Sequence, residues 1–328
     1  MKRLQGPGGA CLEKPFPAFP SLVNSVLFQS RGGRKVKQYQ DLLRDVLENG
    51  SKRGNTLSVF GRIARYDLSQ GFPLTTTKKI DFNSIVHELL WLISGDTNIH
   101  YLVQNNVNIW NEWPFEQFKK SAEYKNESMQ EFAEKIKTNA AFSKRYGDLG
   151  PIQGAQWRYF GEFDQFQWVI ERIKKFPNDR RLIVNSWNTP QIAKLALPPA
   201  HMMYQFNVSE DKLSCAMYQR SCDAFTSLPV NVASYALLTT MVAQVTGFKA
   251  GEFIHVIGDL HLYENNLEQA REVLGRTPRK MPQLIVNPGV KSIHDFKFKD
   301  FELTEYDPYP PIKAPVNVTS PNFELLSA

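Results

Sequence analysis

The longest apolar run of this 328-residue chain, PVNVASYALLTTMVAQVTGF at residues 229–248, constrains the fold most. Its apolar residues recur with helical period, and polar residues interrupt it too often for a membrane span, which needs about 18 apolar residues. Strand patterns surround it: HMMYQFNV and KLSCAMYQRS flank the polar turn SEDK, and EFIHVIGD follows the run. Because strands and helices do not alternate regularly, we expect an α+β fold.

No proline-rich or glycine-rich linker divides residues 37–318, which predicts a single domain there. Within it, residues 114–147 are charged and read as a surface insertion, with one helical pattern in SMQEFAEKIKTNAAFSK. Near the end of the chain, FKFKDFEL at residues 296–303 alternates apolar and polar residues, which predicts a strand. Residues 1–36 predict a flexible N-terminal extension, and residues 319–328 a C-terminal extension.

The net charge of +6 and the pI of about 9.0 would suit a nucleic-acid-binding protein. However, residues 1–36 hold six basic residues against one acidic residue, so the rest of the chain carries a net charge of only +1. A nucleic-acid partner is therefore not expected. Three cysteines make a disulfide framework improbable, and the chain begins without a signal-peptide pattern. These features predict a cytoplasmic protein with no membrane partner.

Ten motifs occur along the chain in a fixed order. They are GFPLTTTKK, HELLWLISGDTNI, VNIWNEW, DLGPIQGAQWR, DRRLIVNSWN, LALPPAH, YQRSCDAF, LPVNVASYALL, GDLHLYENN and YDPYPPIKAPV. On these motifs, from about Lys37 to Val318, the sequence resembles thymidylate synthase and its relatives, the pyrimidine nucleotide hydroxymethylases. The resemblance implies an α+β sandwich of helices on a mixed sheet. It also implies a homodimer that pairs these sheets and shares its active sites.

A nucleoside monophosphate carries nearly two negative charges, so its site needs fixed cations. The motif YQRSCD supplies Arg220 and Ser221, and NDRRL supplies Arg180 and Arg181. The resemblance implies that the first pair binds phosphate within the subunit and that the two arginines reach it from the partner. The segment SKRGNTLSVFG is shorter than the family's phosphate loop and offers Arg53 as its arginine.

The base and the sugar have their own candidate residues. The amide of Asn231 matches O4 and N3–H of uracil, although an asparagine at this point could also cap the following helix. His261 and Tyr263 are two residues apart, which places both on one face of an extended segment, and the resemblance assigns them to the sugar 3′-hydroxyl. Gln219 has the same spacing to Ser221 and is expected to face the nucleotide.

Glu88 lies in a helix otherwise rich in Leu, Trp and Ile, where a buried carboxylate is costly unless it is functional or paired. The resemblance implies that it orders water and proton transfers beside the base. It also implies 5,10-methylenetetrahydrofolate as the one-carbon donor. A row of tryptophans is more often part of a hydrophobic core than of a cofactor site. The implied folate-side residues are Lys78, Ile109, Trp110, Trp113, Leu197, Asp223, Ser227 and Val230.

The nucleophile of the family reaction is missing. In the family, a cysteine thiolate adds to C6 of uracil so that C5 can attack the one-carbon donor. The corresponding position in LALPPAH is Ala200, which cannot supply this step. In GPIQG, Gln153 stands where the family has a tyrosine that assists removal of the C5 proton. The catalytic positions implied by the resemblance are Ala200, His201, Glu88, Gln153 and Asp223.

Three functions remain open at this point. The first is transfer of a methyl or hydroxymethyl group from the folate to C5 of dUMP or UMP, without the usual nucleophile. The second is a folate-independent reaction on a pyrimidine nucleotide, and the third is non-catalytic nucleotide binding with a regulatory role. The folate-side segment also departs from the family, with Thr226, Ser227 and Val230 in place of leucine, glycine and phenylalanine. No metal site is expected.

Overall fold

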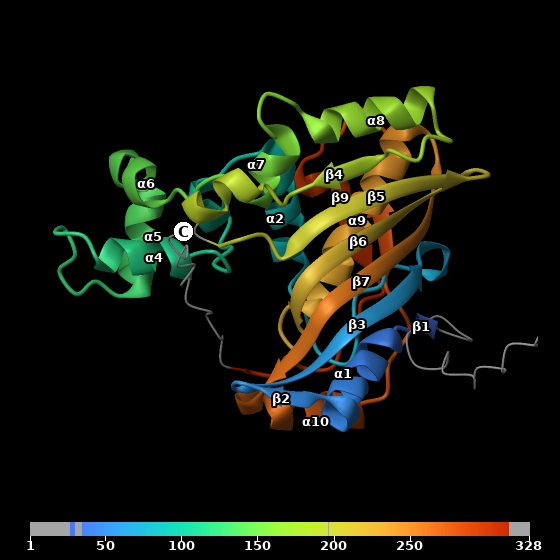
Figure 1. Cartoon of the computed structure of the whole chain (residues 1–328), viewed down its shortest axis with the longest axis horizontal. Coiled ribbons are helices and arrows are strands. Elements are labelled where there is room, and N and C mark those ends of the chain that lie inside the picture. The colour runs from blue at the N-terminus through green and yellow to red at the C-terminus, as the bar shows by residue number, and fades with distance from the viewer. Residues whose placement is uncertain (1–26, 30–34, 196, 315–328) are drawn as a thin grey trace, which may run out of the picture.

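The computed structural model describes residues 27–29, 35–195 and 197–314 (Figure 1). Its centre is a seven-stranded sheet in the order β1-β3-β7-β6-β5-β4, with β2 paired to β3 beside this path. β1 runs parallel to β3 and β6 runs parallel to β7, whereas the other pairs are antiparallel. The expected α+β fold on a mixed sheet is therefore confirmed.

The strands of this sheet are β1 (Leu27–Gln29), β2 (Ser51–Arg53), β3 (Thr56–Asp67), β4 (Ile183–Asn185), β5 (His201–Ser209), β6 (Lys212–Asp223) and β7 (Lys249–Tyr263). A separate two-stranded sheet holds β8 (Gln283–Val286) and β9 (Phe301–Thr304). The helices are α1 (Gln38–Asn49), α2 (Phe82–Ser94), α3 (His100–Gln104), α4 (Glu112–Lys119), α5 (Met129–Thr138), α6 (Ala140–Tyr146), α7 (Gln153–Arg158), α8 (Gln165–Lys175), α9 (Leu228–Thr246) and α10 (Leu267–Gly275). Short 3₁₀ turns are η1 (Leu68–Gln70), η2 (Thr189–Lys194), η3 (Glu264–Asn266) and η4 (Phe298–Asp300).

The long apolar run forms α9, which packs against β6 and β7 and ends at Gly247 in the left-handed conformation. By length and mean hydropathy, 1.3, this helix could cross a membrane, but 78% of the window lies buried inside the protein. The ring of Tyr235 stacks on Phe253 of β7, with centroids 5.8 Å apart. Helix α9 is therefore the core helix behind the sheet (Figure 1).

The opposite face of the sheet is less covered. One row across four strands joins Ile63, Val256, Tyr218 and Met203, and all four are half-buried. By contrast, Phe253 and Ile257 on the α9 side are fully buried. The sheet thus has one core face and a second face, crossed by this apolar row, that remains partly exposed in the single chain.

Residues 114–147 form a helical lobe, α4 to α6, at one end of the molecule (Figure 1). Its interior is aromatic, because Phe118 and Phe132 are fully buried and their rings lie 5.5 Å apart. The expected single helix is two helices, divided at Asn139. Asn139 is the C-cap of α5 and the N-cap of α6. Its side chain accepts a hydrogen bond from the backbone N–H of Phe142 in α6.

Two expectations for the terminal regions require correction. Leu27–Gln29, inside the expected flexible extension, form β1, which satisfies free backbone groups at the edge of β3. In FKFKDFEL only Phe301–Leu303 belong to a strand, because the carboxylate of Asp300 accepts from the backbone of Lys297 and from Asn287 and turns the chain at η4. Residues 1–26, 30–34 and 315–328, which include the expected C-terminal extension, lie outside the described residues.

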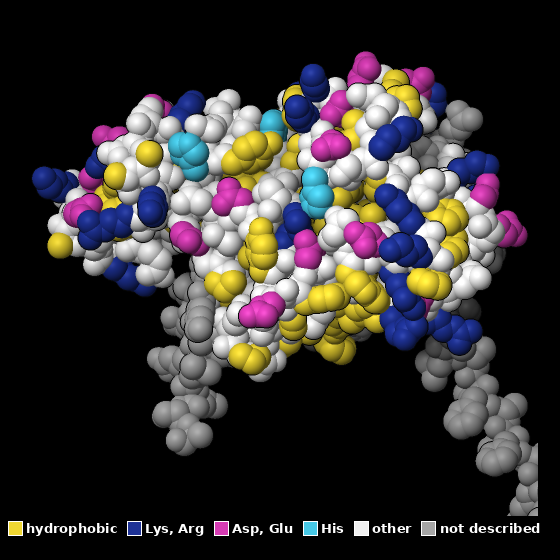
Figure 2. All heavy atoms as spheres, turned by 90° about the horizontal axis from the view of Figure 1, so that it is seen from above, with side chains coloured by type: hydrophobic (Ala, Val, Ile, Leu, Met, Phe, Trp, Pro, Cys, Tyr) yellow, Lys and Arg dark blue, Asp and Glu magenta, His cyan; other side chains and the backbone are white. Residues whose placement is uncertain are grey.

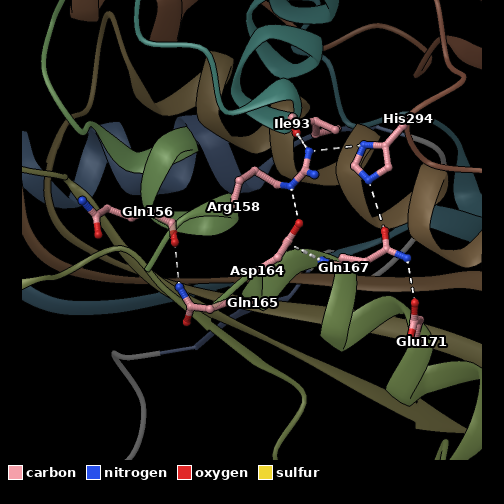
Figure 3. Close-up of polar contacts among 8 residues, drawn as sticks. All are labelled: Ile93, Gln156, Arg158, Asp164, Gln165, Gln167, Glu171 and His294. Carbon is pink, nitrogen blue, oxygen red and sulfur yellow. Dashed lines mark hydrogen bonds and ion pairs between the residues drawn. The ribbon is translucent and has the colours of Figure 1, made fainter. Parts of the chain in front are cut away.

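Helices α2 and α7 meet backbone to backbone. A Cβ atom at Gly154 would lie 2.6 Å from the carbonyl oxygen of Leu92 and 2.8 Å from its Cα atom. Arg158, at the end of α7, also donates to the carbonyl of Ile93 at 2.9 Å and to Asp164 at 2.8 Å (Figure 3). The spacing between Glu88 on α2 and Gln153 on α7 is therefore set by the backbone.

Gly154→Ala should lower the free energy of unfolding by about 1–3 kcal/mol, because the methyl group overlaps backbone that cannot rotate away. Gly275→Ala, in α10, is the matched control, since its new methyl group would meet open space. Urea unfolding monitored by circular dichroism measures both. Equal stabilities for the two variants would contradict the close contact between α2 and α7.

Candidate functional site

The pairing of β5, β6, β7 and β3 brings most of the candidate residues onto the face that packs against α9. His201 pairs with Gln219, and Asp223 pairs with His261, which in turn pairs with Ser58. Residues paired directly across neighbouring strands share a face, and so do residues two apart along a strand. Residues from four sequence motifs are therefore collected at one end of the sheet.

Gln219 is a buried amide that organises its neighbours. Its Oε1 accepts from Asn231 Nδ2 at 3.1 Å and contacts His255 Nε2 at 2.8 Å, while its Nε2 donates to the carbonyl of Ser221 at 2.9 Å. Asn231 lies in the first turns of α9 and makes no cap hydrogen bond there. Its orientation is set instead by Gln219, to which its amide donates, and by a hydrogen bond with His201. The alternative role of Asn231 as a helix cap is not supported.

The loop that carries Ala200 is held by Arg220. Its backbone N–H donates to the carbonyl of Ala200 at 2.9 Å, and its guanidinium donates to the carbonyls of Pro199 and Pro198 at 2.9 and 2.7 Å. The guanidinium also lies 5.8 Å from the ring of Trp187. Arg220 thus places a positive charge directly beside position 200, where Ala200 offers only a methyl group.

His201 and Gln153 meet beside this loop. Gln153 Nε2 lies 3.4 Å from His201 Nδ1, and the ring of Tyr235 packs edge-on against the imidazole at 5.2 Å. Burial lowers the pKa of His201 to about 4, and a hydrogen bond from the imidazole to Asn231, which favours the charged form, offsets this only in part. His201 is therefore neutral at physiological pH.

Glu88 is the acidic group of the site. Burial raises its pKa to about 7, although Trp110 Nε1 donates to its carboxylate at 2.7 Å and favours the charged form. Below pH 7 the carboxyl group is mainly protonated, and above pH 7 it is mainly ionised. Such a group can both give and accept a proton near neutral pH.

The tryptophans form a connected wall. Trp110 lies 5.4 Å from Trp113 and 5.8 Å from the buried Trp91, which shows that the wall continues into the core. The indole N–H of Trp113 is buried without a hydrogen-bond partner among the described residues. Ile109, next to this wall, is 50% exposed. Leu197 and Val230 are half-buried.

Asp223 and Lys78 are already engaged with neighbouring groups. Asp223, at the end of β6, accepts from the backbone N–H of Phe225 at 2.8 Å and from the hydroxyl of Thr226 at 2.6 Å, so it orders the turn before α9. Lys78 is buried, donates to the carbonyl of Phe225 and lies 3.7 Å from the centre of its ring. Burial lowers the pKa of Lys78 to about 8. Ser227 begins α9 without capping it.

The sugar and phosphate candidates lie near the ends of β6 and β7. His261 and Tyr263 pack edge to face at 5.4 Å, and Ser221 pairs with Asp259 of the neighbouring strand. Arg53, at the end of β2, forms an ion pair with Asp259. Sequence reasoning missed Asp259, although its position two residues before His261 in GDLHLY places both on one face of β7. It also missed the buried His255 and Tyr235.

Arg180 and Arg181 are not brought to this cluster within one chain. Both are exposed in the connection between α8 and β4, where Arg181 pairs with Asp179 at 2.9 Å. Gln205 binds the carbonyl of Arg180 and lies four residues along β5 from His201, roughly 13 Å at the usual rise of a strand. On the side of the molecule seen in Figure 2, Lys and Arg side chains gather in a column away from the α4–α6 lobe. Over that lobe, acidic and basic side chains are mixed.

The family model for thymidylate synthase matches residues 37–318. The chain belongs to the thymidylate synthase family. A thymidylate synthase from Mycoplasma mobile is 52% identical over 288 residues, covering 86% of this chain and 100% of that protein. One from Mycoplasma genitalium is 53% identical over 280 residues, covering 84% and 97%. One from Listeria monocytogenes is 48% identical over 314 residues, covering 86% and 100%.

This membership confirms the resemblance inferred from the ten motifs. Members of the thymidylate synthase family are one-carbon transferases and use methylenetetrahydrofolate as the donor. The roles of the individual residues in this chain remain predictions.

Trp110→Phe should raise the pKa of Glu88 above its value of about 7, because the variant loses the indole N–H that stabilises the carboxylate. The titration can be followed by the infrared carboxyl band, assigned with Glu88→Gln. Trp168→Phe on α8 removes an indole elsewhere and should leave this titration unchanged. A lower or unchanged value in Trp110→Phe would show that the indole does not stabilise the charged form.

Proposed function

We propose that this protein binds dUMP and methylenetetrahydrofolate in the site around Gln219, and that the site is built to transfer a one-carbon unit to C5 of the base. The observation that carries this proposal is the hydrogen-bonded set of His201, Gln219 and Asn231, which lies beside the cationic loop of Arg220. Relatives that match over their whole length are named thymidylate synthase, which favours methyl transfer over hydroxymethyl transfer and dUMP over UMP.

Asn231 is proposed to read the base. One N–H of its amide is used by Gln219. Its Oδ1 also accepts from His201 but has a second lone pair, which can accept from N3–H of uracil while the second N–H donates to O4. Cytosine presents the opposite pattern, an acceptor at N3 and an amino group at C4. His261 and Tyr263 are proposed to bind the 3′-hydroxyl, and Arg53, Arg220 and Ser221 the phosphate.

The folate side is proposed to be the wall around Trp110. The aromatic rings and the exposed Ile109 are side chains of the type that pack against the flat ring of a pterin. Lys78, Trp113, Leu197, Asp223, Ser227 and Val230 complete the proposed folate-side set. Methylenetetrahydrofolate supplies the one-carbon unit when bound.

The chain's own residues account for proton handling but not for nucleophilic attack. Glu88, with a pKa of about 7, is proposed to relay protons near O4, and neutral His201 to orient the groups around the base. The positive charge of Arg220 would favour a thiolate at position 200, but Ala200 cannot form one. Tighter substrate binding cannot replace a missing covalent step.

Ala200 and Gln153 together favour a second candidate function, nucleotide binding without turnover. Gln153 can donate a hydrogen bond to His201 but cannot act as a phenol. In this second candidate function, the protein binds the nucleotide but does not catalyse the reaction.

We also propose a homodimer that pairs the open faces of two sheets. The half-buried row Ile63, Val256, Tyr218 and Met203 supports this arrangement, because an apolar sheet face needs a cover. In such a dimer Arg180 and Arg181 would bind the phosphate in the partner's site. Sedimentation velocity tests the dimer, and a purely monomeric protein would contradict it. A cytoplasmic location is proposed as well, supported by the free thiols of Cys215 and Cys222.

Ala200→Cys should convert the protein from one that cannot form a covalent adduct into one that can. Intact-mass spectrometry after incubation with 5-fluoro-dUMP and methylenetetrahydrofolate should show no added mass on the unmodified chain, and the mass of both ligands on the variant. Ala200→Ser is the matched control without a thiol. Turnover of dUMP in Ala200→Cys, increased by adding Gln153→Tyr, would favour the enzyme over the second candidate.

An adduct on the unmodified chain would overturn this prediction and point to another cysteine. Cys215 and Cys222 are poor candidates, because both are fully buried and burial raises the pKa of their thiols, for Cys215 to about 12.

Asn231→Asp should narrow or reverse the preference for dUMP over dCMP, with a change of about 1–3 kcal/mol in the difference between the two binding free energies. The carboxylate can accept from the cytosine amino group but cannot donate to O4 of uracil. Isothermal calorimetry measures both nucleotides on both proteins. Asn207→Asp, at an exposed position of β5, controls for the added charge. Equal affinity for both nucleotides in the parent protein would remove the base-reading role.

A further inference from the structure

Asp259 lies between the residues that the proposed function assigns to sugar and phosphate. It pairs with Ser221 of β6 and with Phe60 of β3, and it precedes His261 by two residues on the same face of β7. Its side chain is 17% exposed, so it is largely screened from water. None of the roles proposed above uses this carboxylate.

Three neighbours share its two oxygens. Oδ1 accepts from the hydroxyl of Ser58 at 2.8 Å and lies 3.3 Å from Nδ1 of His261. Oδ2 forms the ion pair with Arg53. An ionised carboxylate can only accept hydrogen bonds, so the ring nitrogen that faces it must carry a proton.

This contact favours one tautomer of His261. When the imidazole carries one proton, that proton is on Nδ1, and Nε2 presents a lone pair. A histidine is commonly held in one tautomer by a carboxylate in this way. A lone pair at Nε2 accepts a hydrogen bond from a hydroxyl group and gives no hydrogen bond to an ether oxygen.

We propose that Asp259 is a positioning residue that fixes His261 as a hydrogen-bond acceptor, so that the site requires a nucleotide whose 3′-hydroxyl is free to donate. The inference rests on the proposed binding of a uracil nucleotide. The same carboxylate also pairs with Arg53, which the proposed function assigns to the phosphate. Because Arg53 is 73% exposed, its ion pair is weak and can be exchanged for a phosphate.

The tautomer can be measured without any nucleotide. The full chain labelled with ¹⁵N-histidine contains six histidines, and the signals of His261 are assigned by their loss in His261→Gln. Near pH 8 the expected spectrum shows a protonated Nδ1 and an unprotonated Nε2 for His261, and Asp259→Asn should shift this balance. A proton on Nε2 in the parent protein would overturn the proposal.

Nucleotide binding distinguishes a positioning role of Asp259 from a purely structural one. Calorimetry with dUMP and 2′,3′-dideoxyuridine monophosphate should give the parent a preference for the 3′-hydroxyl of roughly tenfold, the worth of about one hydrogen bond. Asp259→Asn should reduce this ratio to below about threefold, because the Nε2–H tautomer becomes accessible. Asp259→Glu keeps an acceptor and should restore most of the ratio. Equal weakening of both nucleotides in Asp259→Asn would overturn the proposal.

Glu252→Gln is the matched control, since it neutralises a carboxylate on the same strand that pairs with Arg65 instead. Its ratio should equal that of the parent, and a fall equal to that in Asp259→Asn would also overturn the proposal. If the parent binds neither nucleotide, the proposed function fails, and the tautomer measurement still decides the role of Asp259.

Discussion

The parallel pairing of β6 with β7 is the constraint on which the site depends. It sets Ser221 beside Asp259 and Asp223 beside His261, and it lets Gln219 reach His255 and Asn231 from the core. A shift of one residue in this register would turn every one of these side chains to the other face. The register is held because the alternate residues of β7, such as Phe253 and Ile257, are buried beneath α9.

Burial then gives the same small region two opposite electrostatic effects. It raises the pKa of Glu88 to about 7 and lowers that of His201 to about 4, because in each case the charged form loses its water. A neutral imidazole and a carboxyl group poised near neutral pH can therefore coexist beside the fixed charge of Arg220. Two titratable groups whose pKa values are pushed apart in this way are typical of an acid–base site.

The sequence was sufficient for the fold class, the core helix and most of the residues at the site, since each is carried by a local pattern or motif. It could not reveal contacts that depend on strand pairing. Asp259 of β7 bridges His261 on the same strand and Arg53 of β2. The two-residue spacing to His261 is visible along the chain, but nothing there indicates the ion pair with Arg53. Side-chain hydrogen bonds to the backbone also ended two elements that the sequence periodicity predicted to continue. Asn139 divides one helical pattern in two because its side chain caps a second helix, and Asp300 stops an alternating strand by accepting two hydrogen bonds.

The contact between Gly154 and the backbone of Leu92 has a consequence for how this protein is maintained in a cell. Main chain fixes α2 against α7, and Arg220 holds the loop at Ala200 through backbone carbonyls, so the framework of the site does not rest on the side chain at position 200. Cellular quality control recognises chains by their unfolded fraction and not by their turnover. A chain with Ala200 would therefore persist at the abundance of an active enzyme. It would still bind nucleotide. In a dimer, it would pair with a catalytically active subunit as readily as with a second copy of itself.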